Sequence, residues 1–133
     1  MGDKDSAHPI KSEYTGQVYR VVHCEGALNS FNHAVQRLRA SKRKSMIRGM
    51  VLQIERLASG NRLSTETFLA EGFLPNDKKF FALKRIPVRA YCWRSAVNHN
   101  TWFISHYIYK DHQKLKDKDI QRVHDNWRKL EGL

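Results

Sequence analysis

Basic and aromatic side chains gather in the second half of the sequence, and their types can bind and cleave RNA. They are Lys84, Arg85, Arg89, His106, Tyr109, Lys110, His112, Lys114 and Lys116. Arginine and lysine neutralise phosphates, and aromatic rings stack on unpaired bases. Cleavage by attack of the ribose 2′-hydroxyl on its own phosphate needs a base, a cation that stabilises the phosphorane, and an acid for the 5′ oxygen. These residue types could supply all three. Since no cluster of Asp and Glu is present to bind a metal ion, we expect neither a metal nor another cofactor.

The net charge of +11 is concentrated in two blocks. Residues 36–62 carry +7 and residues 78–133 carry +8, whereas residues 1–35 carry −1 and residues 63–77 carry −3. This separation favours a surface that binds a polyanion, and the alternative is a solvated basic surface. In the first block, four further candidate RNA contacts crowd one predicted helix corner: Arg39, Lys42, Arg43 and Lys44.

Hydrophobic periodicity predicts the elements that must position these side chains. Residues 1–15 are polar and predict a flexible lead-in, and the β-branched and aromatic residues 16–24 predict a strand. Two apolar stripes at helical spacing over residues 27–60 predict a helical hairpin with its corner near residues 40–43. Ser41 is a candidate N-cap for the second helix.

An acidic connector over residues 61–77 leads to the second half of the fold. There the pattern predicts three strands and a last helix, at residues 78–85, 88–95, 101–110 and 117–130. The predicted order is β-α-α-β-β-β-α, an α+β domain that covers residues 16–133.

Strand alternation assigns the candidate residues to faces of the sheet. In the middle strand, Val88, Ala90 and Cys92 suit a core face. Arg89, Tyr91 and Trp93 then lie on the other face, so we expect Arg89 to carry a charge that its neighbours do not need for packing. In the next strand, His106 and Lys110 are expected to share a face with Trp102, Ile104 and Ile108. Tyr107 and Tyr109 are expected on the opposite face.

The two cysteines and the hydropathy indicate the compartment. Cys24 and Cys92 form no CxxC motif, so we expect two buried, reduced thiols. No apolar run approaches the roughly 20 residues of a membrane span, and residues 1–16 contain no apolar signal core. We therefore expect a cytoplasmic protein with no membrane partner.

Three short motifs resemble a known family. Phe81-Ala82-Leu83-Lys84 is followed by Val88-Arg89-Ala90-Tyr91, and residues 104–114 read ISHYIYKDHQK. The first two resemble the paired strands of RelE/ParE-superfamily toxins, and the third resembles a run of the HigB-like branch. A terminal helix like the one predicted at 117–130 follows there too. The resemblance covers about residues 78–130, and the N-terminal half matches only in its predicted layout.

The resemblance implies a RelE-like small antiparallel sheet with the N-terminal helical hairpin packed on it. It also implies a toxin of a type II toxin–antitoxin system, a ribosome-dependent, metal-independent endoribonuclease that cleaves mRNA. The implied partners are the ribosome, mRNA and a cognate antitoxin protein. Arg89 takes the place of the strand arginine that contacts the scissile phosphate, and Lys84 takes the neighbouring basic position. Lys110 and Lys114 take the places of the exit-loop lysines, and His106 takes that of a strand histidine.

The sequence departs from the family pattern where Asp111 replaces a usual lysine and His112 replaces a usual threonine. His112 and Tyr109 are our candidates for the acid and base, with Lys84 and Lys110 holding phosphates. Arg85, His106, Lys114 and Lys116 are candidate RNA contacts. Two other functions stay open: a gyrase-inhibiting toxin of the same superfamily, and a non-catalytic basic module that binds nucleic acid.

Overall fold

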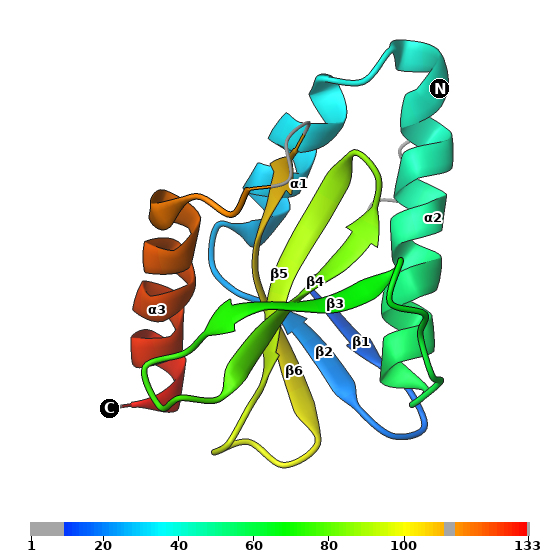
Figure 1. The fold of residues 1–133 in the computed structure, drawn as a ribbon. Coiled ribbons are helices and arrows are strands. Elements are labelled where there is room, and N and C mark those ends of the chain that lie inside the picture. The colour runs from blue at the N-terminus through cyan, green and yellow to red at the C-terminus, as the bar shows by residue number, and fades with distance from the viewer. Residues whose placement is uncertain (1–9, 111–113, 133) are drawn as a thin grey trace.

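The computed structural model describes residues 10–110 and 114–132, which form an α+β fold with three helices and one six-stranded sheet (Figure 1). The elements in chain order are β1 (Glu13–Thr15), β2 (Arg20–His23), α1 (Ala27–Gln36), α2 (Ala40–Ala58), β3 (Phe68–Phe73), β4 (Lys79–Arg85), β5 (Val88–Arg94), β6 (Thr101–Tyr109) and α3 (Asp117–Glu131). The predicted α+β class is confirmed. The order differs from the prediction by two additional strands, β1 and β3.

The strands lie in the order β1-β2-β6-β5-β4-β3, and the sheet is mixed rather than antiparallel as predicted. Strand β2 pairs parallel with β6, with Val21 opposite Trp102. The other neighbouring strands pair antiparallel. The pairing of β2 with β6 places β1 and β2 at one end of the sheet, with β1 as the edge strand.

The N-terminal strand is shorter than predicted, and part of the expected lead-in belongs to the sheet. Residues 1–9 lie outside the described residues, and Glu13–Thr15 form β1. The turn between β1 and β2 packs against the end of α2, where Tyr19 N donates a hydrogen bond to Ala58 O at 2.8 Å. A Cβ on Gly16 would lie 2.4 Å from the Ala58 carbonyl, so this close approach requires glycine.

Two helices, α1 and α2, follow one another within the residues where a helical pair was predicted, but the break between them lies at residues 37–39 and Ser41 is not the N-cap. Helix α2 begins at Ala40, and Arg39 occupies the N-cap position without a side-chain hydrogen bond. Arg43 closes the corner instead. Its Nε donates to Leu38 O at 3.1 Å and its Nη2 donates to Gln36 O at 3.0 Å. These bonds satisfy carbonyl groups that the end of a helix leaves free.

The two faces of the sheet bury separate apolar clusters. On one face, α1 and α2 cover Val88, Ala90 and Cys92. On the other, Tyr91 and Trp93 pack with residues of α3. The alternation predicted for β5 is therefore confirmed, with the difference that α3 covers the second face.

The cysteine prediction is confirmed in the structure, where Cys24 and Cys92 are free and buried. Burial raises the pKa of Cys24 to about 12. Within residues 10–110 and 114–132, no helix is both long and apolar enough to cross a membrane.

Candidate functional site

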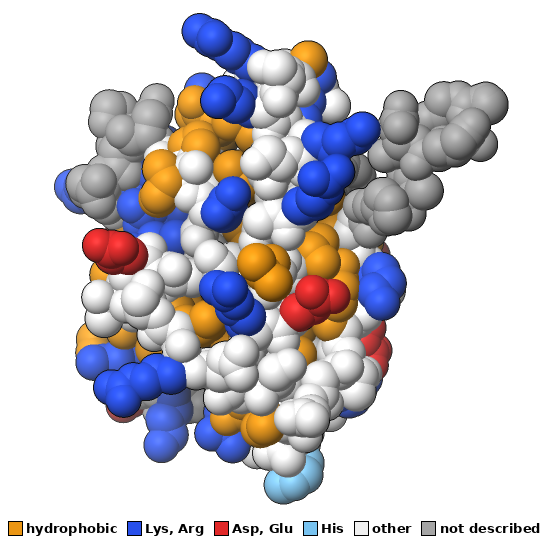
Figure 2. Space-filling view, turned by 90° about the vertical axis from the view of Figure 1, so that its right-hand side faces the viewer, with side chains coloured by type: hydrophobic (Ala, Val, Ile, Leu, Met, Phe, Trp, Pro, Cys, Tyr) orange, Lys and Arg blue, Asp and Glu red, His pale blue; other side chains and the backbone are white. Residues whose placement is uncertain are grey.

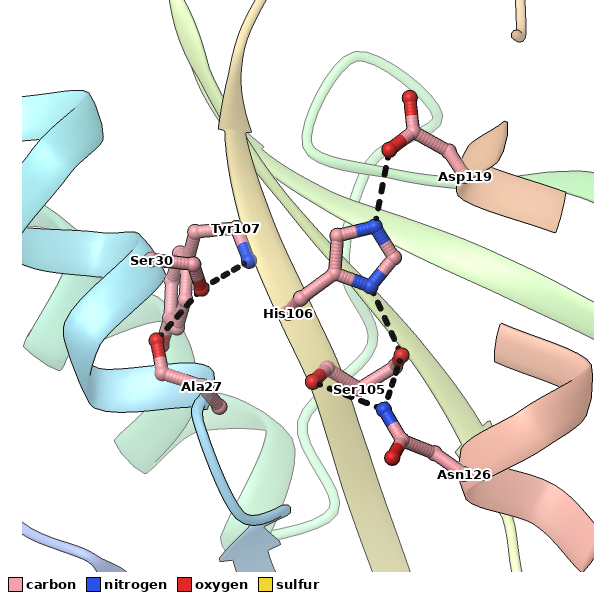
Figure 3. A network of polar contacts seen from close by, with 7 residues as sticks. All are labelled: Ala27, Ser30, Ser105, His106, Tyr107, Asp119 and Asn126. Atoms are coloured by element: carbon pink, nitrogen blue, oxygen red, sulfur yellow. Dashed lines mark hydrogen bonds and ion pairs between the residues drawn. The ribbon is translucent and has the colours of Figure 1, made fainter. Parts of the chain in front are cut away.

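A cavity of about 300 Å³ lies where the C-terminal end of α1, the end of β6 and the start of α3 meet. Strand β2 ends at His23, opposite Ile104, so the second half of β6 has no strand beside it on that edge. Helix α1 covers part of the edge. Ser30 Oγ accepts a hydrogen bond from Tyr107 N at 2.9 Å and donates to Ala27 O at 2.6 Å (Figure 3). The cavity therefore contacts side chains from both faces of β6.

The cavity wall is strongly cationic. Among the described residues that line it, six are lysine or arginine and one has a carboxylate. The basic residues are Arg37, Lys110, Lys114, Lys116, Lys118 and Arg122. The carboxylate belongs to Asp119, which already accepts a hydrogen bond from His106. An anion in this cavity would therefore find cations on several sides.

Lys110 is the most buried of these cations. It is 8% exposed, and its Nζ atom is buried with no hydrogen-bond partner among residues 10–110 and 114–132. Burial lowers the pKa of Lys110, and the positive charge of Arg89 lowers it further. Its backbone N donates to Pro87 O at 2.8 Å, which holds the end of β6 beside the β4–β5 turn. A buried ammonium without a partner is costly, so packing gives no reason for a lysine here.

The side chain of Tyr109 lies on the α1 side of β6. Successive side chains of a strand alternate, so Lys110 belongs to the opposite face. Its ring packs against the core under α1 and α2, and the guanidinium carbon of Arg37 lies 4.3 Å from the ring centre. Both side chains line the cavity. The contact that the structure gives for the Tyr109 ring is therefore with the cation of Arg37.

His106 belongs to a chain of hydrogen bonds that joins β6 to α3 (Figure 3). Asn126 Nδ2 donates to Ser105 Oγ at 2.9 Å, and Ser105 Oγ donates to His106 Nδ1 at 2.7 Å. His106 Nε2 then donates to Asp119 Oδ1 at 3.0 Å. The directions follow because an amide nitrogen only donates and a carboxylate only accepts. A neutral imidazole has one N–H, so His106 that donates from Nε2 must accept at Nδ1.

Burial lowers the pKa of His106, so its imidazole is neutral near pH 7. Burial alone would raise the pKa of Asp119, but the His106 bond and nearby lysines outweigh it and lower that pKa. His106 and Ser105 are completely buried. The order serine–histidine–aspartate resembles a hydrolase triad, but no substrate can reach this serine. The network acts as a clamp between β6 and α3.

A β-bulge at Ser105 corrects the predicted face of His106. Tyr91 pairs with His106 and Cys92 pairs with Ile104, so Ser105 is an extra residue in β6. Ser105 and His106 therefore both point toward α3. His106 shares its face with Ile108 and Lys110 as predicted. It does not share the face of Trp102 and Ile104, which lie with Tyr107 under α1 and α2.

Arg89 is buried and paired, contrary to the expectation that its neighbours do not need its charge. Arg89 Nη1 lies 3.2 Å from Glu71 Oε2, and the two side chains are 6% and 10% exposed. Glu71 is the bulge residue of β3, between Ala70 and Gly72. Arg89 Nε and the neighbouring Tyr91 Oη are buried with no partner among the described residues. Arg89 does not line the cavity.

The structure separates the other strand candidates. Lys84 lies opposite Arg89 in the β4–β5 register and is half-buried. Arg85 points to the other face, because its side chain lies against Gly49 of α2. These three candidates therefore do not share one face, since alternation along β4 turns Arg85 toward α2 and away from the face of Lys84.

The exit-loop and corner candidates lie toward the same end of the molecule. Lys114 and Lys116 are exposed at the cavity, and His112 lies outside the described residues. Arg39 and Lys42 are exposed at the α1–α2 corner. Figure 2 shows lysine and arginine side chains gathered over the N-terminal end of α2. Of the corner residues, Arg43 also has the structural bonds described above.

Sequence reasoning missed several residues of this site. They are Ser30, Arg37, Glu71, Ser105, Asp119, Arg122 and Asn126. A signal existed for two of them, because Asp119 and Asn126 share the helix face of Val123 and Trp127. Polar residues inside an apolar stripe indicate a buried hydrogen-bonding partner. Glu71 and Ser105 sit in bulges, which the strand pattern does not reveal.

Comparisons of the chain with models of known protein families, with curated proteins and with solved structures give no match.

Proposed function

We propose that this protein binds RNA in the cavity between α1, β6 and α3 and cleaves it without a metal ion, as a RelE/ParE-like toxin. The observation that carries the proposal is Lys110, a buried ammonium that has no hydrogen-bond partner in the described part of the chain and lines a cavity rich in cations. Such a group lowers the stability of the fold. A function that needs an anion beside it explains why a lysine stands there.

The chemistry follows from the surroundings of Lys110. Its lowered pKa brings the amine nearer to proton exchange at neutral pH. The neutral amine of Lys110 takes the proton of the 2′-hydroxyl and passes it to the departing 5′-oxygen, while Lys114, Lys116 and Arg122 offset the charge of the phosphorane. The 2′-oxygen then bonds to phosphorus as the bond to the 5′-oxygen breaks. The products are a 2′,3′-cyclic phosphate and a 5′-hydroxyl.

The fold adds support of a coarser kind. The structure supports only the α+β class, because its element order differs from the predicted RelE-like layout by the strands β1 and β3 and its sheet is mixed. The predicted partners, the ribosome and a cognate antitoxin, belong to this proposal as well. Fold analogy alone does not choose a chemistry, so the site must carry the argument.

The burial of Arg89 and His106 favours a second candidate function. Both residues are engaged by carboxylates in the interior, and neither lines the cavity. A basic module that binds RNA without cleaving it would need only the cationic wall. The two candidates differ in whether RNA is broken.

The decisive experiment expresses the chain and maps the 5′ ends of cellular mRNA, then repeats cleavage on ribosomes with EDTA at a level that leaves them intact. The proposal expects new ends in translated mRNA, cyclic or 3′-phosphate termini, and persistence in EDTA. Lys110→Met should abolish these ends without lowering thermal stability, because it removes an unsatisfied charge. Lys79→Gln, at an exposed lysine of β4 that does not line the cavity, is the matched control. Binding without cleavage would favour the non-catalytic module, and a 3′-hydroxyl product would contradict the proposed chemistry.

A further inference from the structure

The guanidinium of Arg37 lies over the ring of Tyr109 at the wall of the cavity. The guanidinium carbon of Arg37 lies 4.3 Å from the centre of the Tyr109 ring. Arg37 follows the last turn of α1, and Tyr109 is the last residue of β6. Their contact therefore joins two elements at the point where the cavity opens.

The two sides of this pair have different surroundings. The Tyr109 ring packs inward against the core beneath α1 and α2, whereas Arg37 is exposed. Among the described residues, no carboxylate lies within ion-pair distance of Arg37. Its positive charge is therefore not neutralised by an ion pair with any described residue. A guanidinium held over an aromatic ring presents a planar outer face on which another ring can stack.

The neighbouring groups indicate what that ring would belong to. Lys110, next to Tyr109 in the chain, contributes a buried ammonium to the same cavity. An anion beside Lys110 and a planar ring on Arg37 together describe a nucleotide, which joins a phosphate to a base. A base that is paired in a helix has its faces covered by its neighbours, so only an unpaired base can stack here.

We infer that Arg37 and Tyr109 form the stacking platform for one unpaired nucleobase, so that the cavity selects single-stranded RNA. This inference rests on the proposed RNA binding at the same cavity, but it does not require cleavage. Arg37 supplies both charge and a plane, and Tyr109 orients that plane from beneath. Specificity for unpaired RNA then arises from shape rather than from hydrogen bonds to particular bases.

The test compares ligands with equal charge. Fluorescent RNA tetramers are titrated by anisotropy against tetramers of the same length whose nucleotides are all abasic. The parent protein should bind the normal tetramer about 10-fold more tightly than the abasic one, in line with the stacking of one base. A stably paired RNA duplex should bind no better than a fully abasic strand with the same total number of phosphates.

Substitutions identify the platform. Arg37→Lys keeps the charge and removes the plane, so it should bind both tetramers with the weak affinity of the abasic ligand. Tyr109→Leu should behave in the same way, and Tyr109→Phe should restore the preference. Since Arg37 is exposed, Arg37→Lys stays informative even if a Tyr109 variant loses stability. Lys79→Gln should keep the parent ratio.

The outcomes separate this inference from the proposed function. Equal binding of both tetramers by the parent, or an unchanged ratio in Arg37→Lys and Tyr109→Leu, overturns the platform while leaving RNA binding in place. Absence of any RNA binding overturns both. Polyglutamate that displaces the tetramer at equal charge concentration would instead indicate an acidic protein partner and overturn the platform. If the parent protein prefers the normal tetramer to the abasic one but cleaves no RNA, the stacking platform is supported and the proposed endonuclease activity is contradicted.

Discussion

Arg89 Nη1 lies 3.2 Å from Glu71 Oε2 in the layer between the sheet and α3, where both side chains are almost fully buried. The pair joins β5 to the edge strand β3 across the intervening strand β4. The Glu71 bulge puts Glu71 and the following glycine on the same face of β3. The position that the family resemblance assigns to a phosphate contact is therefore occupied by an internal ion pair.

Arg89→Ala should lower the free energy of unfolding by about 3–5 kcal/mol, because it leaves the Glu71 carboxylate buried and unpaired. Urea denaturation measures the change. The double variant Arg89→Met with Glu71→Leu should recover much of the loss, since an apolar pair removes both desolvated charges. If Arg89→Ala is as stable as the parent, water solvates the Glu71 carboxylate in the variant. The ion pair would then contribute nothing to the free energy of unfolding.

Ser105→Ala should destabilise the protein by about 1–3 kcal/mol, the cost of leaving the buried His106 Nδ1 without a donor and Asn126 Nδ2 with only its 3.3 Å bond to Ser105 O. A slightly smaller side chain creates little cavity, so the loss should come mainly from the broken hydrogen-bond chain. Exchange of the α3 amides should accelerate, because the network clamps α3 to β6. Ser95→Ala is not a suitable control, since Ser95 binds Glu131. Ser45→Ala, exposed on α2, is suitable and should change little.

Acid should destabilise the fold through His23. Its Nδ1 donates to Ser12 O at 3.3 Å, and its Nε2 accepts from Tyr107 Oη at 2.7 Å. Burial lowers the pKa of His23 from 6.5 to about 4. The unfolded chain thus takes up this proton at a higher pH than the folded chain. The stability from neutral His23 is full above pH 6.5 and is lost as the pH falls toward about 4.

Over that range the loss from His23 should be about 3 kcal/mol, and His106, with a lowered pKa, should act in the same direction. Urea midpoints at pH 7 and pH 4.5 would measure the effect. His23→Gln should be less stable at pH 7 but less sensitive to acid. His99→Gln, at an exposed histidine, should keep the parent's pH dependence. An identical dependence in His23→Gln would assign the effect to other groups.

Substitutions at the α1–α2 corner should divide into two kinds. Arg43→Gln should lower stability by about 1–2 kcal/mol, because Arg43 holds two carbonyl groups at the end of α1. Arg39→Gln with Lys42→Gln should leave stability unchanged and weaken RNA or ribosome binding, with a salt slope reduced by up to about one unit per lost phosphate contact. Filter binding at several salt concentrations distinguishes the two. Unchanged binding in the double variant would make this corner a solvated surface.

The elements with strong periodicity could be predicted from the sequence. β5, β6 and α3 lie close to their predicted residues, because alternation and a helical apolar stripe are local signals. β3 was missed because Phe68–Phe73 contains Glu71 and Gly72, which weaken a strand pattern. β1 has three residues and pairs only with β2, so its pattern is too short to recognise.

The candidate site could be predicted only in part, because its geometry depends on register. Lys110, Lys114 and Lys116 were recognised from residue type and family resemblance, and they line one cavity. The face of His106 could not be predicted, since one extra residue at Ser105 shifts the alternation. Arg37 lies more than half the chain away from Tyr109, and only the packing of α1 on β6 joins them.

The parallel pairing of β2 with β6 has a consequence for how the protein acquires its shape. Strand β2 can join the rest of the sheet only after β6 is in place, because β6 lies between β2 and β5. Contacts between distant parts of a chain form slowly, since a long loop must close first. During synthesis, the cavity lacks the lining residues of β6 and α3 until these elements have left the ribosome. A growing chain therefore does not yet contain this cavity, which forms only when the two halves of the chain meet.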